Sequence, residues 1–239
     1  MASIKAVLFD FGGTLYDYKI LGAAERESLM DLVRWAGVDA GPGPVEVQKA
    51  YRKSLKRVFY DYLPKRFYLH SDFFSDALSG MLDEFGAKTA PEYLVRFRAL
   101  LWERYARDLD LREGVLETLI ELKKRGLYLG LVSNIDEDQL EYLSNIAKIG
   151  PYFDFLLSSE YAKSCKPDQG IFSEAIRRAG CRPGEALFVG DSLAQDIAGA
   201  NQAGLCSVLL WHREDLEPPQ SEPQPRHVIR RIPEVLSLM

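Results

Sequence analysis

Short apolar runs alternate with helical patterns along most of this chain, and this alternation constrains the fold more than any other feature. Between two of the runs, Val115, Leu119 and Leu122 fall at helical spacing, and Gly126 ends the pattern. Strands that alternate with helices indicate βαβ units and a parallel sheet buried on both faces. We therefore predict an α/β fold with a parallel, Rossmann-like sheet flanked by helices. The predicted strands are Ile4–Phe9, Leu127–Val132, Phe153–Leu157, Ala186–Val189, Cys206–Trp211 and the weaker His227–Ile229.

The stretch from about Lys19 to Arg107 breaks this alternation, because it holds no clear buried strand. A helical stripe of apolar residues runs from Val47 to Tyr62, and further helices are predicted at Asp72–Phe85 and Glu92–Tyr105. A helical block inserted after the first strand is expected to form a cap over the strand ends. The predicted domains are an α/β core at residues 1–17 and 108–239 and an all-helical cap at residues 18–107.

The charge balance argues against some partner classes. With 30 Lys and Arg against 35 Asp and Glu, the chain has a net charge of −5, which does not favour nucleic acid or an anionic membrane surface. No apolar run approaches the roughly 20 residues needed to cross a bilayer. The three cysteines lack metal-ligand spacing and fit a reducing compartment. We therefore expect a cytoplasmic protein, monomeric or homodimeric, with no nucleic acid or membrane partner.

Polar motifs lie near the ends of several predicted strands. The carboxyl ends of parallel strands share one edge of the sheet, so residues there can converge although they are far apart in sequence. A carboxylate buried at that edge is costly unless a cation compensates its charge. The motifs are Asp10-Phe11-Gly12-Gly13-Thr14, Ser133-Asn134, Lys166-Pro167, and Gly190-Asp191-Ser192 with Asp196 beyond.

The residue types in these motifs complement one another chemically. Asp10 and Asp191 are suited to Mg²⁺, which prefers hard oxygen ligands. Ser133 ends a strand and precedes a helical segment, so its hydroxyl and the nearby amides can bind phosphate. Lys166 supplies a point positive charge. The sequence thus indicates a phosphate-sized electropositive pocket beside a carboxylate nucleophile.

In this order and on these elements, the motifs resemble those of the haloacid dehalogenase superfamily. The resemblance extends over nearly the whole chain and includes the helical insert, which is typical of the cap subfamily related to phosphoglycolate phosphatase. It implies a Mg²⁺-dependent hydrolase that acts on a small phosphorylated metabolite. The matching residues are Asp10–Thr14, Ser133, Lys166-Pro167 and Gly190–Ser192 with Asp196.

The resemblance also implies a role for each matching residue. Asp10 is the expected nucleophile that forms an aspartyl-phosphate, and covalent catalysis of this kind divides one hard displacement into two easier ones. Ser133 and Lys166 are expected to bind the transferring phosphoryl group. Asp10, the main-chain carbonyl of Gly12 and Asp191 are the expected Mg²⁺ ligands.

Three further polar residues have supporting or open roles. Asp196 is expected to orient Lys166 or a metal-bound water. Thr14 is expected to tie down the turn after the nucleophile, although its hydroxyl can also meet a metal-bound water. Asn134 is open to two interpretations: it binds the phosphate of the substrate, or it only caps the helix that follows.

Position 12 departs from the pattern of this family. Most of its phosphatases have Asp two residues after the nucleophile, where it protonates the leaving oxygen and then deprotonates the attacking water. Gly12 has no side chain for either step, and general acid–base catalysis is typically worth about 10²–10⁴ in rate. The main-chain carbonyl of Gly12 can still bind a metal ion.

Three interpretations of Gly12 stay open. In the first, the chain is a phosphatase in which water, Tyr16, Asp17 or a cap residue moves the proton. In the second, it catalyses a different hydrolysis, as the dehalogenase and phosphonoacetaldehyde hydrolase branches do. In the third, it is a weakly active or non-catalytic relative that binds a phosphorylated ligand or a protein. Asp191 speaks against the dehalogenase branch, which needs no metal, and no lysine stands out as the Schiff base of the phosphonatase branch. We therefore favour the phosphatase.

Overall fold

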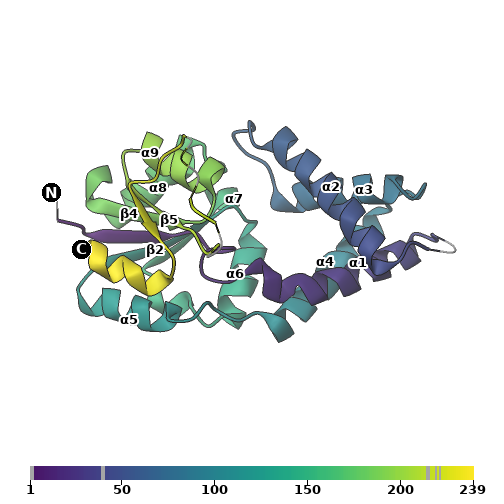
Figure 1. Cartoon of the computed structure of the whole chain (residues 1–239), viewed down its shortest axis with the longest axis horizontal. Helices are drawn as coiled ribbons and strands as arrows, with labels where there is room; N and C mark the ends of the chain where they lie inside the picture. The colour runs from purple at the N-terminus through teal and green to yellow at the C-terminus, as the bar shows by residue number, and fades with distance from the viewer. Residues whose placement is uncertain (1–2, 39–40, 214–215, 219, 221) are drawn as a thin grey trace. The chain divides into compact units, whose positions relative to one another are not determined.

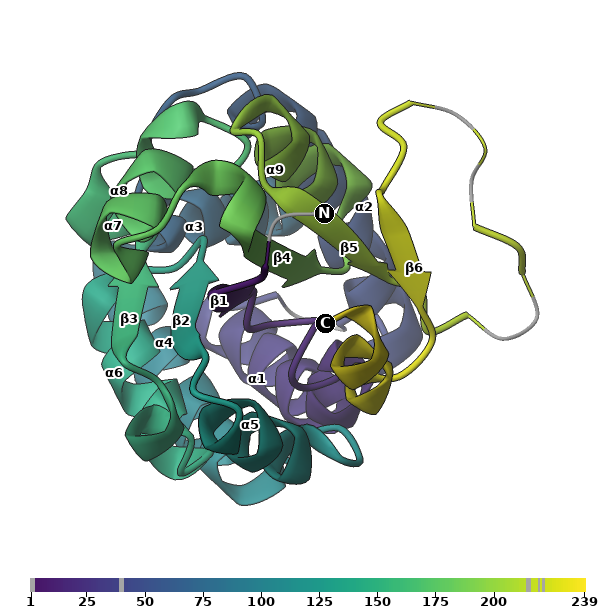
Figure 2. The same ribbon diagram turned by 90° about the vertical axis from the view of Figure 1, so that its left-hand side faces the viewer.

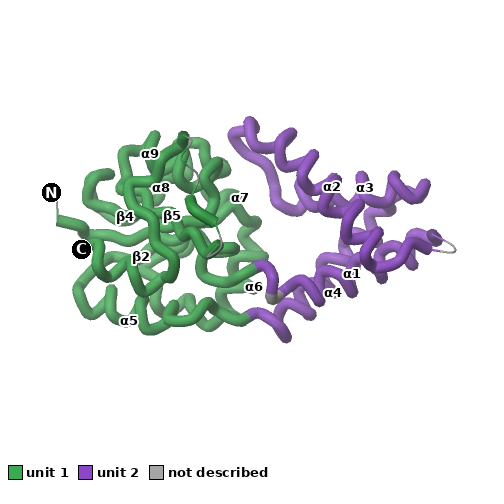
Figure 3. Tube along the Cα trace, in the orientation of Figure 1, with its two compact units in different colours: residues 1–17, 110–239 green, residues 18–109 purple. Residues whose placement is uncertain are grey.

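The structure is a computed structural model that describes residues 3–38, 41–213, 216–218, 220 and 222–239. The chain forms two compact units (Figure 3): a core unit of Met1–Asp17 and Asp110–Met239, and a helical unit of Tyr18–Leu109. The helical unit is therefore a single insertion in the chain after the first strand of the core unit.

A six-stranded parallel sheet forms the centre of the core unit within the described residues (Figure 1). The strands are β1 (Ala6–Phe9), β2 (Tyr128–Ser133), β3 (Phe155–Ser158), β4 (Ala186–Gly190), β5 (Cys206–Leu210) and β6 (His227–Ile229). Their spatial order is β3-β2-β1-β4-β5-β6, which is the order of doubly wound dinucleotide-binding folds. Every predicted strand is present, and the predicted parallel α/β fold is confirmed.

Helices cover both faces of this sheet. The helices of the core unit are α5 (Val115–Lys124), α6 (Glu137–Ile146), α7 (Ser159–Ala162), α8 (Gln169–Ala179) and α9 (Ala198–Gln202). Shorter turns are the 3₁₀ helices Gly150–Tyr152, Pro183–Glu185 and Ile232–Leu238, and a π-helical turn at Leu193–Ile197. Figure 2 shows α8 and α9 on one side of the sheet and α5 with the C-terminal 3₁₀ helix on the other.

The core on the α8 side is close-packed. Leu8 of β1 and Phe188 of β4 belong to one buried cluster with Phe172 of α8, and the two phenylalanine rings meet edge to face with centroids 5.0 Å apart. A Cβ atom on Gly199 of α9 would overlap the Phe172 ring. Glycine at position 199 therefore lets α9, which continues from the turn after β4, pack closely against α8.

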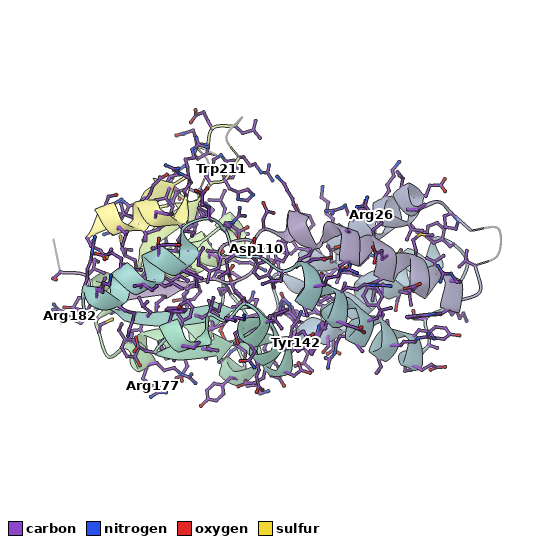
Figure 4. All side chains as sticks on the ribbon, turned by 90° about the horizontal axis from the view of Figure 1, so that it is seen from below. Arg26, Asp110, Tyr142, Arg177, Arg182 and Trp211 are labelled. Atoms are coloured by element: carbon purple, nitrogen blue, oxygen red, sulfur yellow. The ribbon has the colours of Figure 1, made fainter. Side chains whose placement is uncertain are left out.

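Ordinary ion pairs lie on the surface of the core unit. Arg177 pairs with Glu174 at 2.7 Å and Arg182 pairs with Glu185 at 2.8 Å, and the two arginine side chains are 69% and 80% exposed (Figure 4). Each pair has at least one exposed partner, so water screens it, and neither pair decides the fold. They differ from the buried charges at the carboxyl edge of the sheet.

The helical unit pairs α1 with α4 and α2 with α3. Its helices are the 3₁₀ helix Tyr18–Leu21, α1 (Gly22–Trp35), α2 (Pro44–Tyr62), α3 (His70–Asp83) and α4 (Pro91–Asp108). Arg104 of α4 donates to Ser28 Oγ at 2.8 Å and to Asp31 Oδ2 at 2.7 Å of α1. Tyr62 of α2 donates to Asp76 Oδ2 of α3 at 2.6 Å. Three of these helices agree with the predicted ones, whereas α1 was not predicted.

The composition of its buried face explains why α1 was not predicted from the sequence. This face includes Ala24 and Ser28 between larger apolar residues, and the N-cap residue Leu21 makes no side-chain cap hydrogen bond. A weakly apolar stripe without a capping residue gives little signal in sequence. None of the helices in the described part of the chain combines the length and apolarity that a bilayer crossing requires.

Candidate active site

The carboxyl edge of the sheet brings the predicted polar residues together. Asp10 directly follows β1, Ser133 is the last residue of β2, and Asp191 directly follows β4. The strand β1 pairs with β2 on one side and with β4 on the other. The Asp10 N–H donates to the Val189 carbonyl at 2.9 Å, which continues the ladder one residue past β1. These residues lie where the strand order reverses, the usual ligand site of such sheets.

Lys166 reaches this edge from the loop between α7 and α8. Its Nζ donates to Asp10 Oδ1 at 2.6 Å, to Asp196 Oδ1 at 2.7 Å and to the Val132 carbonyl at 3.2 Å. The Lys166 side chain is only 2% exposed. An ammonium group has three hydrogens, so the three acceptors satisfy it completely.

The Asp10 carboxylate has further neighbours on both oxygens. Ser133 Oγ donates to Asp10 Oδ1 at 3.1 Å. Thr14 Oγ1 lies 3.2 Å from Asp10 Oδ2 and 3.4 Å from Asp191 Oδ1. The hydroxyl of Thr14 therefore lies between the two carboxylates, and Asp10 is held in one orientation by side chains from three segments of the chain.

Asp196 is fixed by contacts on both of its oxygens. Its Oδ1 accepts from Lys166, and its Oδ2 accepts from the Ser192 N–H at 2.9 Å. A Cβ atom on Gly190 would overlap the Asp196 carboxyl group, so glycine is needed there. The geometry agrees with the expected orientation of Lys166 by Asp196, although its part in catalysis stays a prediction.

Asn134 holds the main chain of Lys166. Its Nδ2 donates to the Lys166 carbonyl at 3.0 Å, and its Oδ1 accepts from the Lys166 N–H at 2.7 Å. The N-cap position of α6 is Asp136, not Asn134. The Asn134 amide is therefore engaged in positioning the Lys166 loop, a role that neither interpretation of the sequence included.

The turn that carries Gly12 contains a second glycine with a strict conformational requirement. Gly13 has a φ of 86°, and a Cβ atom on it would overlap the Asp191 carboxyl group. Among the described residues, the glycines with positive φ do not include Gly12. Tyr16 stacks edge to face on Phe11 with ring centroids 5.0 Å apart. The turn is thus packed against Asp191 at Gly13, and the backbone of Gly12 is not among those of the described glycines that have a positive φ.

The side chains described at this site carry more negative than positive charge, so without a bound cation it is not the electropositive pocket that the sequence predicts. Burial and the neighbouring carboxylates of Asp10 and Asp196 raise the pKa of Asp191 to about 8. Burial raises the pKa of Asp196 to about 6, although the Lys166 ammonium opposes this shift. Burial disfavours the charge on Lys166, but Asp10 and Asp196 outweigh it, so the pKa of Lys166 is raised.

This excess of negative charge fits a divalent cation. Carboxylate oxygens of Asp10, Asp191 and Asp196 lie within 4.8 Å of one another. Asp10 and Asp191 directly follow β1 and β4 at the carboxyl edge of the sheet, whereas Asp196 lies in the turn beyond and accepts from Lys166 and Ser192. The hard oxygens of Asp10 and Asp191, with a main-chain carbonyl nearby, are ligands that Mg²⁺ prefers.

Arg112 is a part of this region that the sequence did not reveal. Its Nη2 donates to the Gly13 carbonyl at 2.8 Å, and its Nη1 lies 3.3 Å from Asp17 Oδ2. Asp17, one of the residues considered as a proton carrier, thus forms an ion pair. No motif marks Arg112, because its main contact is a backbone oxygen that any residue supplies.

Comparisons with known proteins agree with the geometry. A family model described as haloacid dehalogenase-like hydrolase matches residues 4–204. The chain is 30% identical to the glyceraldehyde 3-phosphate phosphatase of Methanopyrus kandleri over 239 aligned residues, which cover 99% of this chain and 97% of that protein. It is 28% identical to the ribulose-1,5-bisphosphate 5-phosphatase of Halopiger xanaduensis, with 98% of each chain covered.

Solved structures show the same fold. The chain is similar to the magnesium-bound HAD hydrolase YfnB of Bacillus subtilis, with a TM-score of 0.80 and 22% identity, and 99% of each chain is covered. At this level of identity the likeness concerns the fold alone. The match covers residues of both the core unit and the helical unit.

Proposed function

Because the chain belongs to the haloacid dehalogenase-like hydrolases, we propose that it hydrolyses a small phosphorylated metabolite through a phosphoryl group carried on Asp10. The observation that carries the proposal is the contact of Asp10 Oδ1 with both Lys166 and Ser133. A carboxylate held beside an ammonium and a hydroxyl is placed to attack phosphorus while both donors meet the phosphoryl oxygens. The named phosphatases among its relatives support this substrate class.

The reaction has two displacements at phosphorus. In the first, an Asp10 oxygen forms a bond to phosphorus as the ester P–O bond breaks, and the leaving oxygen takes a proton. In the second, water attacks the same phosphorus, its proton is removed, and Asp10 leaves as a carboxylate together with inorganic phosphate. In both steps Lys166 and Ser133 stabilise the charge on the phosphoryl oxygens, and Asp196 and Asn134 hold Lys166 in place.

The residues that would hold Mg²⁺ are Asp10, Asp191 and the main-chain carbonyl of Gly12. When bound, the ion neutralises charge between the anionic nucleophile and the anionic substrate. The raised pKa of Asp191, which reflects its burial beside Asp10 and Asp196, supports a site with room for one more positive charge.

Gly12 leaves the proton transfers without their usual side chain. We infer that water carries the proton, so the rate depends on how well the leaving group departs without assistance. Aryl and acyl phosphates, which need least protonation, should react faster than alkyl phosphates. The helical unit would act as the cap that excludes water and selects the substrate.

The proposal is tested by phosphate release from aryl, acyl and alkyl phosphates, with Mg²⁺ and with EDTA. Asp10→Asn is the control for contaminating phosphatases. Release that needs Mg²⁺ and disappears in Asp10→Asn is the expected result. Halide release from a haloacid in EDTA would instead favour a dehalogenase. Ligand binding without turnover of any substrate would favour a non-catalytic relative.

The expected setting of the enzyme follows from its composition and cysteines. Cys165, Cys181 and Cys206 are free thiols, which supports the proposed cytoplasmic location. The small phosphorylated metabolite is the proposed partner. Nucleic acid and membrane are not proposed as partners, and both a monomer and a homodimer remain compatible with the proposal.

A further inference from the structure

Two segments that connect the core unit to the helical unit are hydrogen-bonded to each other inside the core unit. Tyr16 and Leu111 form an antiparallel bridge, and the Arg112 N–H donates to the Leu15 carbonyl at 2.8 Å. The first segment continues directly from the turn that contains Gly12 and Gly13. The second segment is thus attached to the turn that follows the nucleophile.

The Arg112 side chain strengthens this attachment at one peptide group. Its Nη2 donates to the Gly13 carbonyl at 2.8 Å, and the Gly13 N–H donates to the Tyr16 carbonyl at 2.9 Å. Both main-chain groups of Gly13 are therefore bonded, and Arg112 supplies the bond to its carbonyl. Asp17 Oδ2 lies 3.3 Å from Arg112 Nη1, and this second contact holds the guanidinium in place.

The restraint matters because two adjacent glycines form the turn. Glycine has more conformational freedom than any other residue, so a Gly-Gly turn is intrinsically loose. The Cα of Gly13 lies against the Asp191 carboxyl group. The carbonyl of Gly12 belongs to the peptide that joins Gly12 to Gly13. A movement of Gly13 would therefore displace both the Gly12 carbonyl and Asp191.

We propose that Arg112 is a positioning residue for the magnesium site, because it fixes the Gly12–Gly13 turn against Asp191. The inference rests on the proposed function in one respect, the identity of the bound metal. Arginine suits the task because its two Nη groups bond a carbonyl and a carboxylate at once, in a planar fork. Lysine at this position would keep the charge but could not make both contacts in that geometry.

The test is direct Mg²⁺ binding to the full-length protein by titration calorimetry, without substrate. The variants are Arg112→Gln, Arg112→Lys and Asp17→Asn. Replacement of a residue that orients metal ligands typically lowers metal affinity by about 10–100-fold. We expect Mg²⁺ affinity to fall by about tenfold or more in both Arg112 variants, and by less in Asp17→Asn, which keeps the bond to the Gly13 carbonyl.

Arg125 provides a matched control on the same unit. It also bonds one carbonyl and one carboxylate, the Leu236 oxygen at 2.9 Å and Glu121 Oε1 at 3.0 Å. Arg125→Gln should leave Mg²⁺ affinity unchanged. Thermal unfolding of each variant shows whether the protein is folded, and Asp17→Asn keeps the test informative if the Arg112 variants unfold.

A second set of variants tests whether Arg112 matters because the Gly12–Gly13 turn is flexible. Gly12→Ala removes one glycine from the turn, so the loss caused by Arg112→Gln should be smaller in that background. Equal Mg²⁺ affinity in wild type and Arg112→Gln, with turnover in the wild type, would overturn the inference alone. No Mg²⁺ binding by the wild type would overturn the inference and the proposed cofactor together. Absence of phosphate release despite Mg²⁺ binding would count only against the proposed function.

Discussion

Asn134 and Lys166 are joined by a pair of hydrogen bonds in which one side-chain amide holds both main-chain groups of a residue 32 positions away. The bonds leave the Lys166 side chain free to extend to Asp10 and Asp196. Because we propose Lys166 as a catalytic residue, we expect Asn134 to affect catalysis without touching the substrate.

Replacement of Asn134 should therefore lower kcat more than it raises KM. Each bond contributes about 1 kcal/mol, so Asn134→Ala should lower kcat about tenfold or somewhat more. The kcat of Asn134→Asp, which keeps the acceptor but not the donor, should lie between that of the wild type and that of Asn134→Ala. Asn201→Ala is a control, because Asn201 Nδ2 donates to the Gln224 carbonyl at 2.8 Å. A rise in KM alone would indicate that Asn134 binds substrate directly.

Loss of the Lys166 ammonium should destabilise the protein in a pH-dependent way. Removal of one partner from a buried ionic cluster typically costs about 3–5 kcal/mol, and Lys166→Met leaves Asp10 and Asp196 unpaired. The raised pKa of Lys166 keeps the wild-type residue charged at all pH values below its unfolded pKa. The cost in the variant should be greater at pH 8 than at pH 5, where the carboxylates can take up protons.

Urea unfolding at the two pH values in EDTA measures this difference. Lys123→Met is the control, because Lys123 forms a partly exposed pair with Asp154 at 2.8 Å that should contribute less than about 1 kcal/mol. A loss in Lys166→Met no greater than in this control would contradict the assignment of Lys166 as the centre of a buried cluster.

The metal-free protein should lose stability as the pH rises from about 4 to 8. Burial beside Asp10 and Asp196 raises the pKa of Asp191 to about 8, and burial raises that of Asp196 to about 6. In this window the folded state binds more protons than the unfolded state, so the free energy of unfolding falls with pH. Mg²⁺ must displace the proton of Asp191, so its affinity should rise up to about pH 8.

Thermal unfolding between pH 5 and 8, with EDTA and with Mg²⁺, tests both statements. The stabilisation by Mg²⁺ should increase with pH, and calorimetric titration at pH 7 in buffers of different ionisation enthalpy should detect proton release. A stabilisation by Mg²⁺ that is independent of pH would show that Asp191 does not exchange a proton for the metal.

Two neighbouring glycines should respond in opposite ways to substitution. Gly12→Asp restores the side chain that most phosphatases of this family have, and should raise turnover of alkyl phosphates by about 10²-fold. Gly13→Ala should abolish activity, because residue 13 needs a φ of 86° and its Cβ would overlap Asp191. Steady-state rates on one alkyl and one aryl phosphate test both. No gain in Gly12→Asp would mean that another group already transfers the proton, or that the site cannot fit the side chain.

The parts of the fold that depend on local pattern could be predicted from the sequence. The strand runs of β1 and β4 are apolar and buried throughout, so their burial and parallel pairing follow from composition. The stripe of α2 gave the same kind of signal. The helix α1 did not, because Ala24 and Ser28 in its buried face carry little apolar weight.

In the site, side-chain chemistry was predictable and backbone recognition was not. Asp10 and Asp191 were identifiable as carboxylates directly after strands, and Lys166 as a cation in a motif that matches the family, although it lies in the loop between α7 and α8. Asn134 and Arg112 act on main-chain oxygens, and every residue in the chain has one. Only the three-dimensional structure specifies which oxygen each of them meets.

The three acceptors around Lys166 Nζ have a consequence for ligand selection. In the resting protein no hydrogen of that ammonium is spare, so an incoming phosphoryl oxygen gains the lysine only by replacing an internal partner. The internal acceptors therefore compete with a ligand for the Lys166 ammonium. A ligand must interact with this ammonium more favourably than the acceptor that it replaces. We expect a doubly charged phosphate group to compete for the ammonium better than a singly charged carboxylate, which brings no more charge than Asp10 already does. Discrimination between the two can therefore begin with displacement at Lys166, before any bond to phosphorus is made.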